Sequence, residues 1–157
     1  MSTLEAKVSD FLSLKRIAIA GVSRTKPSPA NIIFKKLKDA GYQVFAVNPN
    51  SSTFEGDPCY PDLKSIPGGI DGVVIVTRPT LTEEIVRQCA EAGVSRVWMH
   101  QSIGTGATSV SSDAVSFCNE HSISVIDGAC PMMFCKPVDF GHKCMRWMLR
   151  LAGGLPK

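Results

Sequence analysis

The loop at residues 21–29, with the sequence GVSRTKPSP, combines residue types that suit a phosphate group. Its opening glycine permits a sharp turn where a strand ends. Arg24 and Lys26 supply positive charge, and three side chains supply hydroxyl groups: Ser23, Thr25 and Ser28. A helix that begins directly after the loop adds free N–H groups and a partial positive charge. The loop therefore predicts a phosphate site; the alternative is a solvated connection whose charges serve solubility alone.

The next strand ends on Asn48, which argues against an ordinary NAD site. A dinucleotide fingerprint has the glycines of G-x-G-x-x-G and an acidic residue at this strand end to bind the ribose hydroxyls. Here only Gly21 remains of the glycines, and the acid is absent. An acid-free strand end near Arg24 and Lys26 tolerates a further phosphate on the ribose. The sequence therefore favours a phosphorylated adenosine ligand, either coenzyme A with its 3′-phosphate or NADP with its 2′-phosphate.

Alternating strands and helices must position these loops. Short apolar segments typical of buried strands lie at residues 16–20, 43–47, 72–76, 96–99 and 123–126. Helical patterns lie at residues 30–41, 83–93 and 108–121, with a short helical turn within 63–72 and a basic amphipathic helix over about 139–152. Strands rich in Val and Ile that alternate with helices indicate a parallel sheet covered on both faces. We predict a single Rossmann-like, doubly wound α/β domain over residues 1–157, with a mostly parallel five-stranded sheet and a core at about 10–135.

In an open α/β sheet, ligands bind beyond the carboxyl ends of the strands. Polar or Gly- and Pro-bearing loops follow the predicted strands at residues 21–29, 48–50, 77–80, 100–105 and 127–132. We expect these loops to meet at one edge of the sheet and to form one ligand site.

Composition excludes several other classes of protein. Seventeen Lys and Arg against 14 Asp and Glu give a net charge of +3, which is too small to indicate a nucleic-acid surface. No apolar run approaches the roughly 18 residues of a membrane span, and the N-terminal segment lacks the apolar region of an export signal. We therefore expect a cytoplasmic protein with reduced cysteines that binds neither nucleic acid nor membranes.

Five motifs, in this order, resemble the small stand-alone CoA-binding proteins. They are GVSR at 21–24, VNP at 47–49, YPDL at 60–63, VWMHQ at 97–101 and DGACPM at 127–132. Those proteins are similar to the N-terminal, CoA-binding domain of the succinyl-CoA synthetase α subunit. The resemblance spans about residues 10–135 and implies a Rossmann-like fold with coenzyme A, or an acyl-CoA, lying across the strand ends.

Carried over position by position, the resemblance implies a role for each loop. The turn is shaped by Gly21 and Val22, and the phosphates are met by Ser23, Arg24, Thr25 and Lys26. The adenosine and its 3′-phosphate are bordered by Asn48, Pro49 and Asn50, and the adenine side is walled by Thr77, Arg78 and Pro79. Further along the ligand lie His100 and Gln101, and the pocket is closed toward the pantetheine by Cys130 and Pro131.

The sequence favours binding without catalysis by the chain alone. His100 follows a strand at the ligand edge, but no acid is adjacent in sequence to orient it, so positioning of a ligand is its expected role. The C-x₄-C spacing of Cys130 and Cys135 is loose for zinc, and no metal is expected. A mixed disulfide between Cys130 and CoA is one hypothesis, and inert packing of that thiol is the alternative. Ligase chemistry is not expected, because the phosphohistidine of the synthetase belongs to a second domain.

The C-terminal helix leaves further alternatives open. Its Phe140, Trp147 and Leu151 can share one face, and Lys143 and Arg150 can share another. Packing on the sheet is the expectation; a homodimer or partner-protein contact and a membrane-surface contact are the alternatives. For the whole chain, the competing functions are an NADP-binding oxidoreductase or sensor and a protein-interaction module that uses this helix.

Overall fold

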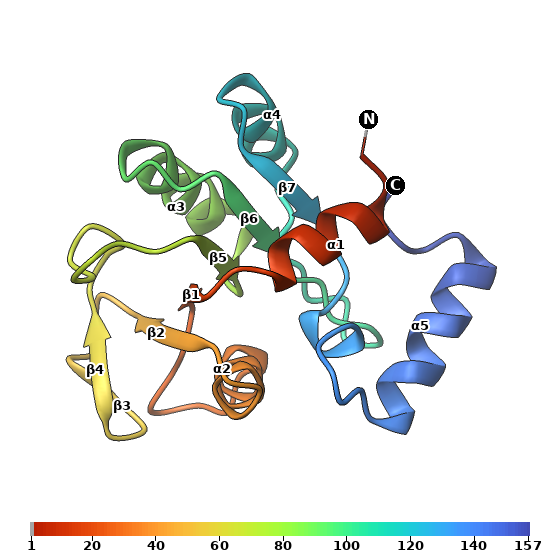
Figure 1. The fold of residues 1–157 in the computed structure, drawn as a ribbon, viewed down its shortest axis with the longest axis horizontal. Helices are drawn as coiled ribbons and strands as arrows, with labels where there is room; N and C mark the ends of the chain where they lie inside the picture. Colours follow the sequence, from red (N-terminus) through yellow and green to blue (C-terminus); the bar gives the residue numbers. More distant parts are fainter. Residues whose placement is uncertain (1) are drawn as a thin grey trace.

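The computed structural model describes residues 2–157 and contains one seven-stranded sheet with helices on both faces (Figure 1). The helices are α1 (Leu4–Leu12), α2 (Pro29–Asp39), α3 (Pro79–Glu91), α4 (Ser112–Glu120) and α5 (Phe140–Ala152), with a short 3-10 turn, η1 (Pro131–Met133). The strands are β1 (Arg16–Ala20), β2 (Gln43–Val47), β3 (Thr53–Phe54), β4 (Asp57–Tyr60), β5 (Gly72–Ile75), β6 (Arg96–Met99) and β7 (Ser124–Asp127). Their order across the sheet is β3-β4-β2-β1-β5-β6-β7, and every pair is parallel except β3 with β4.

Alternating side chains along β1 divide the core into two layers. Ile17 and Ile19 face the layer that holds α1 and α2, and Ala18 and Ala20 face the layer that holds α3 and α4. This alternation is the period of two expected of a strand. Because both faces are covered, the central strands are apolar throughout, as the sequence predicts for a parallel sheet.

The α/β class and the five predicted strands are confirmed, but the sheet has two more strands than predicted. Strands β3 and β4 form a hairpin whose turn residues, Glu55 and Gly56, both have positive φ. The hairpin extends the sheet because β4 pairs in parallel with β2. It was missed because its strands are two and four residues long and β4 contains Pro58, a residue that usually argues against a strand.

Two helix predictions also need correction. The helix predicted at 83–93 begins earlier, at Pro79, because proline suits the first helical position. The helix predicted at 108–121 begins only at Ser112, because Thr108 bridges to Gln101 and Ser111 caps the helix. Residues 63–72 contain single hydrogen-bonded turns, from the Ile66 amide to the Leu63 carbonyl and from the Gly69 amide to the Ile66 carbonyl, in keeping with the short turn that was predicted. Helix α1 was not predicted, and it covers the sheet near β7.

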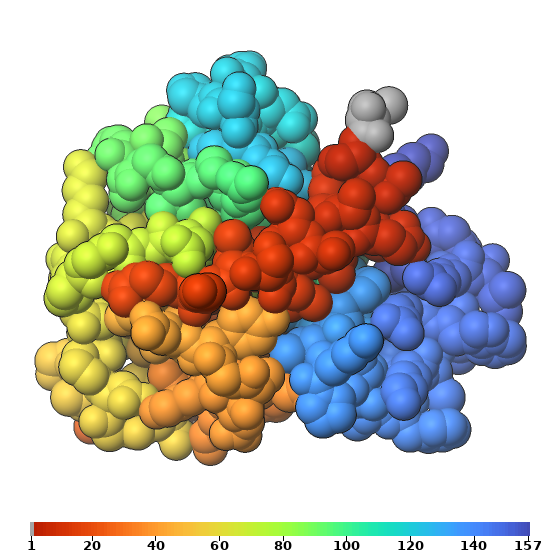
Figure 2. Space-filling model, in the orientation of Figure 1, coloured from red at the N-terminus to blue at the C-terminus, as the bar shows by residue number. Residues whose placement is uncertain are grey.

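Helix α5 does not pack on the sheet with the face that was predicted to be buried. None of its residues is fully buried, and Phe140 and Leu151 are 81% and 70% exposed. Met145 and Leu149 instead make its apolar contact with the core beside η1. The helix therefore lies at one end of the molecule, next to α1, where Arg150 and Glu5 form an ion pair of 3.1 Å (Figures 1 and 2).

Within residues 2–157, no helix is long and apolar enough to cross a membrane.

Candidate functional site

The turn after β1 is built around Gly21, where three strands converge. Its amide donates to the carbonyl of Val47, at the end of β2, over 3.2 Å. Its φ is +106°, and a Cβ at this position would lie only 2.1 Å from the carbonyl oxygen of Val76, just beyond β5. Only glycine fits this approach, so the residue type itself brings the carboxyl ends of β1, β2 and β5 together.

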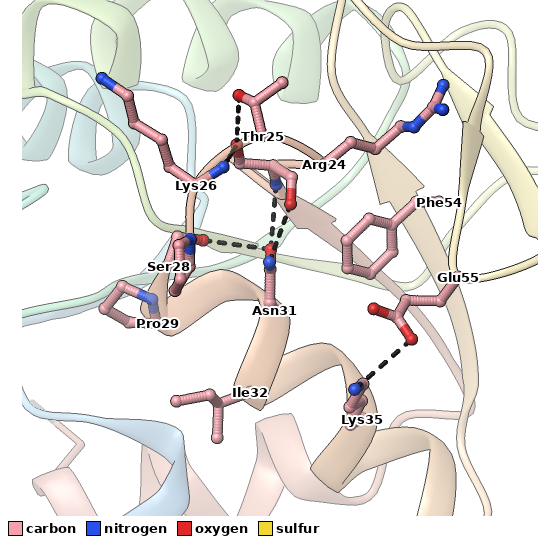
Figure 3. A pocket seen from close by; sticks show the side chains of 12 residues that line it. Arg24, Thr25, Lys26, Ser28, Pro29, Asn31, Ile32, Lys35, Phe54 and Glu55 are labelled. Carbon is pink, nitrogen blue, oxygen red and sulfur yellow. Dashed lines mark hydrogen bonds and ion pairs between the residues drawn. The ribbon is translucent and has the colours of Figure 1, made fainter.

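Asn31, in the first turn of α2, holds the loop between β1 and α2 over the N-terminus of this helix (Figure 3). Its Oδ1 accepts hydrogen bonds from the Ser23 amide at 2.9 Å and the Ser28 hydroxyl at 3.2 Å. Its Nδ2 donates to the Ser23 carbonyl at 2.8 Å. The Lys26 amide also donates to the Ser23 hydroxyl, at 3.1 Å. Asn31 is not among the predicted site residues, because its role depends on the folded path of the loop.

A cavity of about 740 Å³, named here the α2 cavity, lies between this loop and the β3–β4 hairpin. It is lined by Ser23, Arg24, Thr25, Lys26, Pro27, Ser28, Pro29, Asn31, Ile32, Lys35, Phe54 and Glu55. Lys35 is paired with Glu55 at 3.4 Å, but Arg24 and Lys26 have no carboxylate partner within residues 2–157. Figure 3 shows their side chains leaving the loop in opposite directions. Two free cations beside a helix N-terminus form an anion-binding arrangement.

A second cavity, of about 250 Å³, adjoins the other side of Gly21 and is named the α3 cavity. The predicted residues Asn48, Pro49, Asn50 and Thr77 line it together with four residues of α3, two of them apolar and two polar: Leu81, Ile85, Glu84 and Gln88. Asn48 is already engaged, because its Nδ2 donates to the Val22 carbonyl at 2.7 Å and its Oδ1 accepts from the Asn50 amide at 2.8 Å. Asn48 therefore acts as a brace between two loops.

A third cavity, of about 200 Å³, is named the His100 cavity. It is lined by Pro29, Ile32, Ile33, His100, Ser102, Ile103, Thr105, Cys130, Met132, Met133, His142 and Met145. The side chain of His100 is buried, with 4% of the residue exposed, and neither ring nitrogen has a hydrogen-bond partner in the described chain. Burial lowers the pKa of His100 to about 4, so the ring is neutral at pH 7.

His142 adds a second imidazole to this wall, and Asp139, which does not line the cavity, is its partner; neither was among the predicted site residues. Asp139 caps α5, and its Oδ1 accepts from the His142 amide at 3.0 Å. Its Oδ2 lies 2.6 Å from His142 Nδ1. The amide and ring hydrogen bonds from His142 lower the pKa of Asp139, which is therefore a carboxylate at neutral pH. The spacing of three residues at a helix start is a local signal, but the sequence did not reveal that His142 lines the same cavity as His100.

Five predicted site residues, Val22 among them, line none of the three cavities. Arg78 precedes α3 as its N-cap, and Pro79 is its first residue. Gln101 is exposed and bridges to Thr108, while Pro131 is buried at the start of η1. Val22 supports the loops that line them, and the other predicted residues each line one of the three cavities.

Burial dominates the chemistry of the cysteines. It raises the pKa of Cys130 to about 11, so this thiol stays protonated at neutral pH. Among residues 2–157, no three His, Cys, Asp or Glu side chains are placed to hold a metal ion together.

The buried ring of His100 predicts an acid-sensitive fold. The unfolded chain takes up a proton near the ordinary pKa of 6.5, whereas the folded ring remains neutral to about pH 4. Protonation of His100 in the unfolded chain therefore lowers the free energy of unfolding as the pH drops below 6.5. The loss reaches up to about 3 kcal/mol near pH 4, and above pH 6.5 there is none. Urea unfolding at pH 7, 5.5 and 4.5 should show a weaker pH dependence for His100→Gln than for the wild type. An equal pH dependence of the free energy of unfolding in His100→Gln and the wild type would refute the claim that His100 is buried in its neutral form. His121→Gln, at an exposed histidine, serves as the control.

Comparison with known proteins assigns the chain to a family. A model of the "CoA binding domain" matches residues 15–136. The chain belongs to the CoA-binding domain family. The match includes the strand-end loops and stops before α5, so Asp139 and His142 lie outside the part that the family model describes.

Relatives of this CoA-binding domain occur in longer enzymes and as short chains. This chain is 31% identical to ADP-forming acetate–CoA ligase II of Archaeoglobus fulgidus, over 54% of this chain but only 13% of the ligase. It is 27% identical to the protein YneT of Bacillus subtilis, over 80% of this chain and 90% of that protein. The chain thus spans about an eighth of the length of the ligase.

Solved structures show the same fold. A hypothetical protein from Pyrococcus horikoshii OT3 superposes with a TM-score of 0.74 at 29% identity, covering 83% of this chain and 89% of that one. The redesigned binding protein Prb, based on PH1109, superposes with a TM-score of 0.72 at 26% identity, covering 98% and 94%. The Rossmann-like α/β assignment therefore stands on both the topology and these neighbours.

Proposed function

We propose that this chain binds coenzyme A or an acyl-CoA at the carboxyl ends of its strands. Membership of the CoA-binding domain family supports the class of ligand. The observation that carries the placement is the α2 cavity, where Arg24 and Lys26 stand free beside the N-terminus of α2. A diphosphate needs such charge-assisted hydrogen bonds, and the loop supplies them without other partners competing for the cations.

The order of the cavities supports one direction for the ligand. The α3 cavity lies on one side of the β1 turn and accepts the adenosine, bordered by Asn48, Pro49, Asn50 and Thr77. Arg78 and the start of α3 lie beside it for the 3′-phosphate. The diphosphate occupies the α2 cavity at residues 23–26, and the pantetheine runs past Pro29 toward His100 and Cys130. Gln101 and Pro131 support this end of the path from outside the cavity wall.

Calorimetric titration with CoA, dephospho-CoA and NADPH tests the proposal. We expect CoA to bind at least about 10-fold more tightly than dephospho-CoA, because a charge-assisted contact to the 3′-phosphate contributes about 1.5–3 kcal/mol. Equal affinity for the two ligands would remove the 3′-phosphate assignment. Tighter binding of NADPH than of CoA would favour the NADP-binding alternative, and no binding of any nucleotide would favour the interaction module.

Contact of α5 with a partner chain stays a prediction. The exposed Phe140, Trp147, Met148 and Leu151 are the residues that such a contact would cover.

A further inference from the structure

The His100 cavity continues the proposed ligand path beyond the phosphates. It shares two wall residues, Pro29 and Ile32, with the α2 cavity, and both appear at the lower edge of that cavity in Figure 3. A ligand whose diphosphate lies at residues 23–26 can therefore extend past these side chains into the His100 cavity. For an acyl-CoA, the group that arrives there is the thioester. This step rests on the proposed function.

The walls of the cavity suit a short acyl chain. Apolar side chains line most of it: Ile33, Ile103, Met132, Met133 and Met145. An apolar cavity of about 150 Å³ holds a guest of the size of benzene. At about 200 Å³, the His100 cavity has room for a thioester and an acyl chain of a few carbons, but not for a long-chain acyl group.

His100 is an unused hydrogen-bonding group aimed into this space. It is 4% exposed, lines the cavity, and has no partner for either ring nitrogen in residues 2–157. No fully buried side-chain nitrogen or oxygen lacks a partner in residues 2–157, so the unpartnered ring nitrogens of His100 are reached from the cavity, where a ligand can hydrogen-bond to them. Its neutral ring has one N–H donor, which matches the carbonyl oxygen of a thioester and the oxyanion that forms when that carbonyl is attacked.

His142 supplies a base with a fixed orientation. Its Nδ1 carries the proton toward the Asp139 carboxylate at 2.6 Å, which leaves the lone pair on Nε2. The side chain is 24% exposed and lines the cavity, so water can reach it. An imidazole held by a carboxylate in this way is the usual form of a general base.

Cys130 shares the cavity but is a poor nucleophile. Its thiol is protonated at neutral pH because of burial, and it makes no hydrogen bond to His100 or His142 in the described chain. Water next to His142 is the better candidate to attack a thioester.

We propose that the chain hydrolyses short-chain acyl-CoA thioesters in the His100 cavity. His142 Nε2 takes a proton from water as the water oxygen bonds to the thioester carbon. The carbonyl electrons move to oxygen, where the His100 N–H stabilises the negative charge. The oxyanion then collapses, the C–S bond breaks, and the CoA thiolate takes the proton from His142. The products are a carboxylic acid and CoA, and no oxidant, reductant or metal is consumed.

Chromatographic assay of CoA release from acetyl-CoA, butyryl-CoA and palmitoyl-CoA tests this inference. We expect the wild type to hydrolyse the two short thioesters and not palmitoyl-CoA. His142→Gln should lower kcat by at least about 100-fold, the usual contribution of a general base. Asp139→Asn retains an oxygen that can cap α5. Because Asp139 positions His142 and does not touch the substrate, this variant should lower kcat while KM for butyryl-CoA stays the same. His121→Gln, at the exposed residue that follows α4, should hydrolyse at the wild-type rate.

Parallel calorimetry with butyryl-CoA separates the two proposals. Binding without hydrolysis, or hydrolysis that His142→Gln leaves intact, overturns this inference and leaves the proposed function standing. An acyl group found on Cys130 by mass spectrometry overturns the water route. Absence of binding to every CoA ester overturns the proposed function and the hydrolysis together.

Discussion

Replacing Gly21 with alanine should destabilise the protein by about 2–5 kcal/mol. The new Cβ would lie 2.1 Å from the Val76 carbonyl oxygen, and the φ of +106° disfavours any residue with a Cβ. The left-handed backbone costs about 1–2 kcal/mol, and a clash in a well-packed region costs a further 1–3 kcal/mol or so. Since whole domains are stable by only about 5–15 kcal/mol, this loss is a large fraction of the total free energy of unfolding, and the variant should unfold at a clearly lower urea concentration than the wild type.

Gly41→Ala is the matched control for this prediction. Its φ of +95° is similar, but a Cβ there would have no atom within 4 Å. The free energy of unfolding of Gly41→Ala should therefore fall only by the cost of the left-handed backbone, about 1–2 kcal/mol. Urea unfolding followed by circular dichroism measures both variants. Equal losses would mean that the close approach of the β1 turn to β5 does not exist, and the geometry of the site would have to be revised.

The double variant Arg24→Ala, Lys26→Ala should bind CoA about 100-fold more weakly than the wild type. Each side chain is exposed and free of carboxylate partners in the described chain, so its charge is available to the ligand. Charge-assisted hydrogen bonds contribute about 1.5–3 kcal/mol each, and two of them account for at least this loss. The free energy of unfolding should change by less than about 0.5 kcal/mol, because neither side chain supports the fold.

Lys38→Ala provides the control for the loss of charge. Lys38 lies near the C-terminal end of α2, pairs with Asp57, and does not line the α2 cavity. Calorimetric titration should give it nearly the wild-type affinity for CoA. The wild type should also bind more weakly as salt is added, and the double variant should show a smaller dependence. If the double variant binds as tightly as Lys38→Ala, the phosphates are not at this loop.

The sequence predicted the central sheet well because that sheet depends on local apolar patterns. The strands from Arg16, Gln43, Gly72, Arg96 and Ser124 are Val- and Ile-rich runs bounded by turn residues, and they form as expected. The β3–β4 hairpin could not be found in the same way, because its strands are short and are held by pairing with other strands, β4 with β2 and β3 with β4.

The site was predicted where its residues follow strands and missed where side chains arrive from elsewhere. Ser23, Arg24 and Lys26 were identified because loop chemistry is visible in sequence. Asn31 was overlooked because its amide reaches back eight residues to Ser23, a contact that only the folded loop reveals. Phe54 and Glu55 reach the α2 cavity from the unpredicted hairpin, and His142 reaches the His100 cavity from a helix that was expected to cover the sheet.

Mapping CoA by ¹H–¹⁵N correlation spectra tests the central claim most directly. Increasing amounts of CoA should shift the amide signals of Ser23 to Lys26, Asn50, Thr77 and His100, at the carboxyl ends of the strands. The amides of Asn119 and Ser122, which lie at another cavity of the molecule, should not move. Shifts at the strand-end loops would place CoA at the carboxyl ends of the strands, as proposed. Saturating CoA that leaves those loops unchanged, or that shifts Asn119 and Ser122 instead, would contradict it.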